Sequence, residues 1–410
     1  MKKIKVLMLV PNLFVANGVA SFVMNYLRNL NHDEVQVDIA SYKEGDSVYY
    51  AEVEAAGGKM FFLPGIKNLP EHVKVCNKIL SDGRYDIIHD NTLHISIPMM
   101  WCAKKAGVPV RILHSHNSKM GETPAKAFRN RFFLPVLRSL ATNYAACSQL
   151  AGRAMFEDQG FTVIPNVIQT EKYRFDPTMR KSVRQKMNAT DKFVVGTVGR
   201  LAEQKNPFFA MDVFECLQKQ VPNAEYWWVG SGSLDDQVKA YVEKKGLFGK
   251  VKLLGSRNDT VELYQGMDVF FLPSLFEGLP VTGVEAQAMG LPIVVSESIT
   301  KEMVYTDLVD YVDLKELKEV WAKHLEDTMD KKIERSKYAE QLKYSEFSNY
   351  RCGKNLLYIY IEMLKKKKKL DMKSGDKTLN IGGFGRVSYR KNHQSACIYN
   401  SAIYCLSINK

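Results

Sequence analysis

Two carboxylates, Glu277 and Glu285, stand eight positions apart across a junction where a strand gives way to a helix. The apolar run 267–274 is typical of a buried strand in a parallel sheet. Pro280 suits the first turn of the following helix, and Gly290 suits its end. We therefore expect Glu277 in the loop at the carboxyl edge of the sheet and Glu285 little more than one turn into the helix, with both facing one ligand.

A pair of cations, Arg200 and Lys205, follows another apolar strand and precedes a helix that begins at Pro207. Their side chains should emerge at the carboxyl edge of a sheet, beside a helix N-terminus whose free N–H groups favour anions. This combination suits a diphosphate, since each charged hydrogen bond contributes about 1.5 to 3 kcal/mol. The alternative is a solvated loop.

Loop glycines and one histidine are further candidates. Gly18 follows the first strand and could let the backbone approach a phosphate or sugar. Gly230 and Gly232 form a Gly-x-Gly loop after a strand, without the third glycine of a dinucleotide fingerprint. His116 ends a strand in the first half and should face a cleft. The alternatives are ordinary turn glycines and a structural histidine.

A repeated pattern predicts the fold class. A helix end, then Gly-x-Pro, then a strand occurs at 103–114 and again at 286–296. Glycine closes the helix in a left-handed cap, and proline prevents its continuation. Together with the other strands and helices, this predicts an α/β chain of two Rossmann-like doubly wound domains that face each other across a cleft. The other expected strands are 6–10, 35–40, 86–89, 144–147, 193–198, 225–229 and 251–254.

We place an N-terminal Rossmann-like domain at 1–168 and a C-terminal Rossmann-like domain at 169–345, with the boundary near 164–167. A helix at 346–364 is apolar enough to pack back on the body. The basic tail at 365–410 is expected to be disordered or non-native, because its five-lysine run could reflect a slipped reading frame.

Charge and cysteine content bound the function. The net charge is +12, but the chain from Lys365 onward holds eleven basic and two acidic residues, a net +9, which leaves +3 for residues 1–364. The body is therefore nearly balanced, and we expect no nucleic-acid partner. Seven cysteines without CxxC or metal-ligand spacing fit a reducing cytoplasm, and no run approaches the roughly 20 apolar residues of a membrane-spanning helix. The stretch 125–140 mixes arginine with phenylalanine, which fits either a membrane interface or a half-buried core helix.

Taken together, the motifs resemble the retaining, nucleotide-sugar-dependent glycosyltransferases of GT-B fold, the Glu-x7-Glu or group 1 family, over about residues 3–364. The segments 111–117 and 276–280 resemble its capsular and exopolysaccharide branch. Asn166-Val167-Ile168-Gln169 departs from the usual Asn-Gly-Ile-Asp, and Asn17 replaces the first glycine of a common pair. The matching positions, in chain order, are Asn17-Gly18, His116, Ser148, Arg200 with Lys205, Gly230 to Gly232, and Glu277 with Glu285.

The resemblance implies that the domain at 1–168 binds the acceptor and the domain at 169–345 binds the nucleotide sugar. It also implies that Arg200 and Lys205 bind the donor diphosphate and stabilise the leaving nucleotide without a metal ion or other cofactor. Glu285 would accept hydrogen bonds from the ribose, Glu277 would hold the transferred sugar, and His116 would contact that sugar near its anomeric centre. The expected catalytic residues are thus His116, Glu277, Arg200 and Lys205. The expected donor-binding residues are Gly18, Gly199, Gly230, Gly232, Gly278, Leu279 and Glu285.

The implied reaction transfers a hexose from a nucleotide sugar, expected to be a UDP-sugar, to a lipid-linked glycan or oligosaccharide with retention of configuration. The expected location is the cytoplasm, with a peripheral position on the inner face of the membrane left open. Two alternatives also stay open: a nucleotide-sugar epimerase of the same fold, and a non-catalytic glycan- or nucleic-acid-binding protein, for which the basic tail is the only support. The sequence identifies neither the sugar nor the acceptor nor the linkage.

Overall fold

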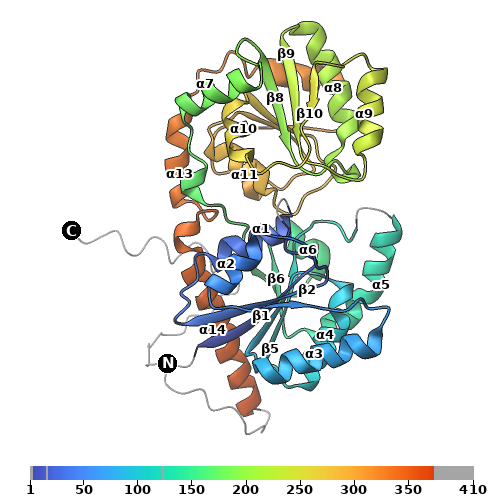
Figure 1. Cartoon of the computed structure of the whole chain (residues 1–410), viewed down its shortest axis with the longest axis vertical. Helices are drawn as coiled ribbons and strands as arrows, with labels where there is room; N and C mark the ends of the chain where they lie inside the picture. Colours follow the sequence, from blue (N-terminus) through green and yellow to red (C-terminus); the bar gives the residue numbers. More distant parts are fainter. Residues whose placement is uncertain (1–2, 15–16, 122–123, 374–410) are drawn as a thin grey trace, which may run out of the picture. The chain divides into compact units, whose positions relative to one another are not determined.

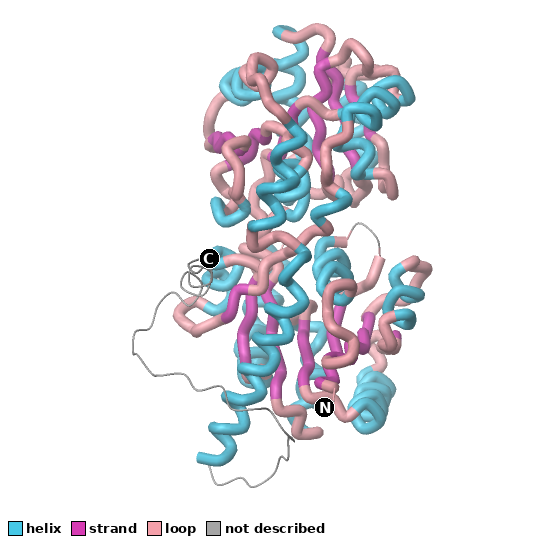
Figure 2. Tube along the Cα trace, turned by 90° about the vertical axis from the view of Figure 1, so that its left-hand side faces the viewer, coloured by secondary structure: helices cyan, strands magenta, loops and turns pink. Residues whose placement is uncertain are grey.

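The computed structural model describes residues 3–14, 17–121 and 124–373, so the end of the expected tail lies outside the described residues. Two parallel sheets, each between layers of helices, belong to one compact unit (Figure 1). Figure 2 shows the strands of each sheet between its helices. The predicted α/β class and the two Rossmann-like sheets are confirmed.

The first sheet has the strand order β3-β2-β1-β4-β5-β6-β7, and all its pairs are parallel. Its strands are β1 (Ile4–Val10), β2 (Val35–Ser41), β3 (Met60–Phe62), β4 (Ile87–Asp90), β5 (Val110–Ser115), β6 (Asn143–Ala146) and β7 (Thr162–Val163). Its helices are α1 (Gly18–Leu27), α2 (Tyr49–Ala55), α3 (Leu69–Gly83), η1 (His94–Ser96), α4 (Ile97–Lys105), α5 (Pro124–Leu140) and α6 (Gln149–Phe156).

The second sheet has the order β10-β9-β8-β11-β12-β13 and is also parallel. Its strands are β8 (Phe193–Val198), β9 (Ala224–Val229), β10 (Val251–Leu253), β11 (Val269–Leu272), β12 (Ile293–Ser296) and β13 (Val309–Val312). The helices that follow the first sheet are η2 (Thr170–Lys172), α7 (Pro177–Lys186), η3 (Glu203–Lys205), α8 (Pro207–Gln220), α9 (Asp235–Lys244), α10 (Thr260–Gly266), α11 (Val281–Ala288), η4 (Lys301–Met303), α12 (Lys318–Glu326), η5 (Arg335–Lys337), α13 (Tyr338–Tyr344) and α14 (Asn349–Lys373).

The strands expected from the sequence all form, whereas β3, β7 and β13 were not expected. These three lie at sheet edges and span two to four residues, which is too short for a readable periodicity. Gly107 and Gly290 have φ values of +73° and +64°, so both Gly-x-Pro units close their helices as predicted.

The final helix differs from its expected range of 346–364. Helix α14 begins at Asn349 and continues to Lys373, so the lysine run is helical and the expected disorder is wrong for 365–373. Lysine is a good helix former, and neither glycine nor proline interrupts this run. Although α14 follows the second sheet in the chain, its Leu356 and Tyr360 join the core around the first sheet. The domain boundary at 168 and 169 remains a prediction.

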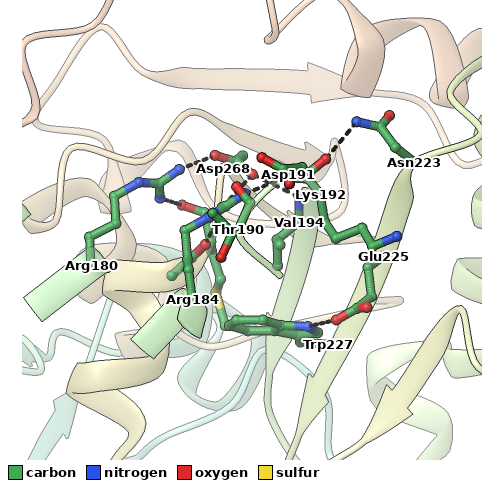
Figure 3. Close-up of polar contacts among 12 residues, drawn as sticks. Arg180, Arg184, Thr190, Asp191, Lys192, Val194, Asn223, Glu225, Trp227 and Asp268 are labelled. Atoms are coloured by element: carbon green, nitrogen blue, oxygen red, sulfur yellow. Dashed lines mark hydrogen bonds and ion pairs between the residues drawn. The ribbon is translucent and has the colours of Figure 1, made fainter. Parts of the chain in front are cut away.

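A cluster of charges fastens α7 to the amino edge of the second sheet (Figure 3). Asp268 Oδ2 accepts from Arg184 Nη1 at 2.9 Å and from the Val194 amide at the start of β8 at 2.8 Å. Arg180 forms a second ion pair with the same carboxylate. This cluster lies at the end of the strands opposite to the carboxyl edge where the candidate site residues were predicted.

Candidate functional site

A cavity of about 410 Å³ lies where strands of both sheets end. Loops that follow β5, β8 and β11 bring to it several residues that were predicted separately. His116 comes from the first sheet, and Arg200, Lys205, Glu277 and Gly278 come from the second. The carboxyl ends of parallel strands are the usual ligand-binding edge of such sheets.

Glu277 is fixed by two neighbours at this edge. Its Oε1 pairs with Lys205 Nζ at 2.6 Å, and its Oε2 accepts from Gln204 Nε2 at 3.1 Å. Only 6% of Glu277 is exposed. The predicted sugar-binding carboxylate and one predicted diphosphate-binding cation therefore form a partly buried ion pair, brought together because β8 and β11 are neighbours.

Positive charge gathers on the same wall of the cavity. Arg200 lines it and is exposed. Val281 and Thr282, the first residues of α11, also line it. The first N–H groups of a helix have no partner within the helix and attract anions. The lysine, the arginine and the helix N-terminus are the groups that the predicted diphosphate site would use.

The opposite wall holds His116, whose protonation can be deduced from its partner. The Asn91 amide nitrogen donates to the carbonyls of Leu9 and His89, both at 3.2 Å, which leaves Asn91 Oδ1 as an acceptor. That oxygen lies 2.8 Å from His116 Nε2, so Nε2 holds the proton. Burial lowers the pKa of His116 to about 3, so the ring is neutral near pH 7 and its Nδ1 is an acceptor.

Behind His116 lies a buried histidine chain that ends on the C-terminal helix. The rings of His116 and His114 stack with centroids 4.1 Å apart. His114 Nδ1 lies 2.9 Å from His89 Nε2, and His89 Nδ1 lies 2.7 Å from Tyr360 Oη on α14. Burial lowers the pKa of His89 to about 3 and holds that of His114 well below its usual range.

Glu285 has different surroundings from Glu277. Tyr173 Oη donates to its Oε1 at 2.6 Å, and Tyr264 Oη donates to its Oε2 at 2.9 Å. Burial raises the pKa of the Glu285 carboxyl, and the two tyrosine hydrogen bonds oppose that shift. Glu285 is not among the residues that line the cavity. That both carboxylates face one ligand remains a prediction.

The predicted glycines fall into two groups. Gly18, Gly199 and Gly278 line the cavity, as does Leu279. A Cβ at Gly18 would meet no atom within 4 Å, so packing within the chain does not require glycine there. A Cβ at Gly278 would lie 2.2 Å from the His116 carbonyl oxygen, so this glycine allows the two walls of the cavity to touch.

Gly230 and Gly232 do not line the cavity. Gly230 has a φ of +131°, and a Cβ there would lie 2.2 Å from the Gly199 carbonyl oxygen. A Cβ at Gly232 would lie 2.2 Å from the Leu201 carbonyl oxygen. Both glycines let the loop after β9 pack against the backbone that holds Arg200. Their contribution to the site is therefore indirect. Their direct contact with the donor remains a prediction.

Two hydrogen bonds hold the loop after β11 against the first sheet. Ser148 Oγ donates to the Gly278 carbonyl at 2.8 Å, and Asn166 Nδ2 donates to the Leu279 carbonyl at 2.9 Å. Asn17, which replaces a glycine of the resembled family, caps α1 by accepting from the amides of Val19 and Ala20.

The sequence did not indicate several polar residues of the cavity. Four of its lining residues contain a buried polar atom without a hydrogen-bond partner, and such atoms call for an explanation. They are His114 Nε2, Asn117 Oδ1, Asn166 Oδ1 and Thr282 Oγ1. Polar atoms of a ligand, or water in the cavity, would supply the missing partners. Asn91 and Asn117 could have been found by their place after β4 and β5, whereas Thr282 and the tyrosines around Glu285 have no comparable pattern.

Within the described ranges, no three or more His, Cys, Asp or Glu side chains are grouped so as to hold a metal ion. The metal-independent reaction and the absence of a cofactor stay predictions. None of the helices in the part of the chain that the structure describes is long and apolar enough to cross a bilayer.

Comparisons with known proteins place the chain in a family. Residues 179–344 match the family described as "Glycosyl transferases group 1", and residues 16–172 match "Glycosyltransferase Family 4". EpsF of Bacillus subtilis (strain 168), which has the name of a glycosyltransferase, is 33% identical over 74% of this chain and 83% of its own length. An Escherichia coli protein named UDP-Gal:alpha-D-GlcNAc-diphosphoundecaprenol alpha-1,3-galactosyltransferase is 27% identical over 68% of this chain and 76% of its own. CapH of Staphylococcus aureus, named as a glycosyltransferase of capsular polysaccharide biosynthesis, is 27% identical over 67% of this chain and 76% of its own length.

Solved structures show the same fold. Alr3699/HepE of Anabaena, in complex with UDP and glucose, superposes with a TM-score of 0.66 at 17% identity and covers 92% of this chain and 100% of that one. WaaG, a glycosyltransferase involved in lipopolysaccharide biosynthesis, gives a TM-score of 0.68 at 15% identity and covers 87% of this chain and 99% of that one. The chain is related to EpsF, both of its halves match glycosyltransferase family models, and its fold is GT-B. It therefore belongs to the group 1 glycosyltransferases, with relatives in polysaccharide biosynthesis.

Proposed function

We propose that this glycosyltransferase moves a hexose from a UDP-sugar to a lipid-linked glycan with retention of anomeric configuration and without a metal ion. The observation that supports this best is the cavity in which Arg200, Lys205 and the N-terminus of α11 face His116. The cationic wall would bind the diphosphate and stabilise the charge that develops on the leaving nucleotide. One relative is named for a UDP-Gal donor, and one structural neighbour was solved with UDP-glucose, and both support the choice of donor.

The transferred sugar would lie between Glu277 and His116. Glu277 can accept from sugar hydroxyls while Lys205 keeps its charge compensated. His116 would offer its unprotonated Nδ1 as a further acceptor, because Asn91 occupies Nε2. Glu285 would accept from the ribose hydroxyls, its carboxylate already oriented by two tyrosines.

The contacts of both carboxylates support retention by front-face attack. A double displacement would need a carboxylate free to attack the anomeric carbon, as in retaining glycosidases. Glu277 is held by Lys205 and Gln204, and Glu285 lies outside the cavity lining. In the proposed step the bond from the anomeric carbon to the β-phosphate oxygen breaks while the acceptor oxygen bonds to the same face. The acceptor proton passes to the leaving phosphate oxygen, and UDP departs.

The test begins with a panel of nucleotide sugars screened for thermal stabilisation of the full chain. The best donor is then incubated, with a chelator present, with a monosaccharide linked to diphosphoundecaprenol. We expect a lipid-soluble glycosylated product whose new linkage, read by NMR, has the anomeric configuration of the donor. An inverted linkage, or transfer that stops when the chelator is added, would contradict the proposal.

The epimerase alternative has a separate readout. An epimerase of this fold would convert the UDP-sugar in the absence of any acceptor. Chromatography of the donor incubated with the protein alone therefore separates the two functions. We expect slow hydrolysis at most, and rapid formation of an epimeric sugar would favour the alternative.

A further inference from the structure

Helix α5 has an outward apolar face as well as an inward one. Phe128, Phe132 and Val136 are 75%, 68% and 44% exposed, and their spacing of four residues places them in one stripe along the helix. The opposite side buries Leu134 and Leu137 in the core. The core therefore explains only one side of the helix, and the stripe needs another explanation.

Basic side chains border this stripe. Arg129 and Arg131 are exposed and, at 100° per residue, fall on either side of it. Neither α5 nor the adjoining α4 contains an acidic residue. Lys104, near the end of α4, donates to the Ser139 carbonyl of α5 at 3.2 Å, which adds another cation beside the stripe.

The same helix is tied to the cavity from its inner side. Asn130 donates to the Met120 carbonyl, in the loop that continues from His116. The ring of Phe133 stacks on that of His94, in the segment that follows Asn91. The stripe is thus on the outer surface of the element whose inner surface supports the histidine wall of the site.

From these observations we propose that the α5 face, defined as Phe128, Phe132 and Val136 with Arg129 and Arg131, docks on an anionic lipid bilayer. Aromatic side chains enter the boundary between headgroups and acyl chains, while arginines bind the phosphates. A two-fold contact between copies of this chain would instead bring the same arginines together. This proposal rests on the proposed function in one respect: if the acceptor is lipid-linked, docking would bring that acceptor beside the cavity.

The test uses the full chain and two kinds of vesicle, one of phosphatidylcholine and one that also contains phosphatidylglycerol. We expect cosedimentation with the anionic vesicles that weakens as salt rises. The double variant F128S/F132S keeps every charge, including the lysine run at 365–369, and should bind at least about tenfold more weakly. R129Q/R131Q should also lose about tenfold or more.

F248S is the matched control, because Phe248 is 82% exposed but lies between α9 and β10, far along the chain from α5. It should bind vesicles like the wild type. Equal binding by F128S/F132S and the wild type would overturn the proposal. So would a wild-type dimer that F128S/F132S turns into a monomer without any vesicle binding, or a preference for an oligonucleotide over vesicles.

Donor hydrolysis without acceptor separates this proposal from the proposed function. F128S/F132S should hydrolyse the UDP-sugar at the wild-type rate, because neither Phe128 nor Phe132 lines the cavity. If the wild type binds anionic vesicles through the stripe but neither hydrolyses nor transfers from any nucleotide sugar, the proposed function fails and the docking surface stands. If transfer is normal and the stripe has no effect on vesicle binding, the docking surface fails and the proposed function stands.

Discussion

Glu277 and Glu285 are chemically identical, but their surroundings give them different hydrogen-bond partners. Lys205 fixes Glu277, whereas Tyr173 and Tyr264 fix Glu285. The sequence placed both carboxylates on the correct loop and helix, because strand, proline and glycine positions are local. It could not indicate the tyrosines, which stand 112 and 21 positions from Glu285 and meet it only through the tertiary fold.

Tyr173 should act on the nucleotide through Glu285. In titration calorimetry we expect the wild type to bind UDP at least about tenfold more tightly than 2′,3′-dideoxy-UDP, since only UDP has ribose hydroxyls that would donate to the Glu285 carboxyl group. The Tyr173→Phe variant should lose several-fold of this preference, because the carboxylate is no longer oriented. Its affinity for the dideoxy compound should stay unchanged.

Tyr305→Phe provides the control for this measurement. Tyr305 Oη donates to the Val284 carbonyl on the same helix and has no bond to Glu285. It should leave the preference for UDP intact. If Tyr173→Phe lost the same affinity for UDP and for the dideoxy compound, the tyrosine would only support folding. If Glu285→Gln kept the normal preference for UDP, Glu285 would not bind the ribose.

Among the elements, α7 depends on the charges at the amino edge of the second sheet. Asp268→Asn removes the partner of Arg180 and Arg184 and should lower the free energy of unfolding by about 3 kcal/mol. Urea denaturation measures this change. Asp236→Asn, at an exposed position of α9, should change it by less than about 0.5 kcal/mol. Similar stability of the two variants would contradict the structural importance of the cluster.

Loop packing marks the limit of what the sequence could predict about the elements. Gly107 and Gly290 were predictable because a helix end followed by Gly-x-Pro is a local pattern. Gly232 and Gly278 are explained by a backbone carbonyl of a distant segment, which no nearby residue indicates. The extension of α14 was missed because a run of lysine reads as a tail until its helix propensity is considered.

At the scale of the whole molecule, α14 follows the second sheet in the chain but packs against the first, where its Tyr360 hydroxyl bonds the buried His89. Burial lowers the pKa of His89 and His116 to about 3 and that of His114 well below its usual value, whereas an unfolded histidine titrates near about 6.5. Between these values the unfolded chain binds more protons than the folded one. Stability is therefore lost as the pH falls through this window.

We expect the free energy of unfolding, measured in urea, to fall between pH 7.5 and 5.5 by about 1 kcal/mol for each of these histidines. A His89→Gln variant should be less stable at pH 7.5 but show a shallower dependence on pH. Stability that is flat over this range would mean that the cluster is protonated in the folded state.

In the proposed function, the cavity and Glu285 together form a nucleotide-sugar donor site. The most direct test is kcat/KM for hexose transfer from the UDP-sugar in Arg200→Ala and Glu285→Ala, with Arg153→Ala, at an exposed position of α6, as the control. We predict a loss of about 10²-fold or more in each site variant and none in the control, because contacts to the leaving nucleotide are removed. Near-normal kcat/KM in both site variants would mean that Arg200 and Glu285 do not bind the donor.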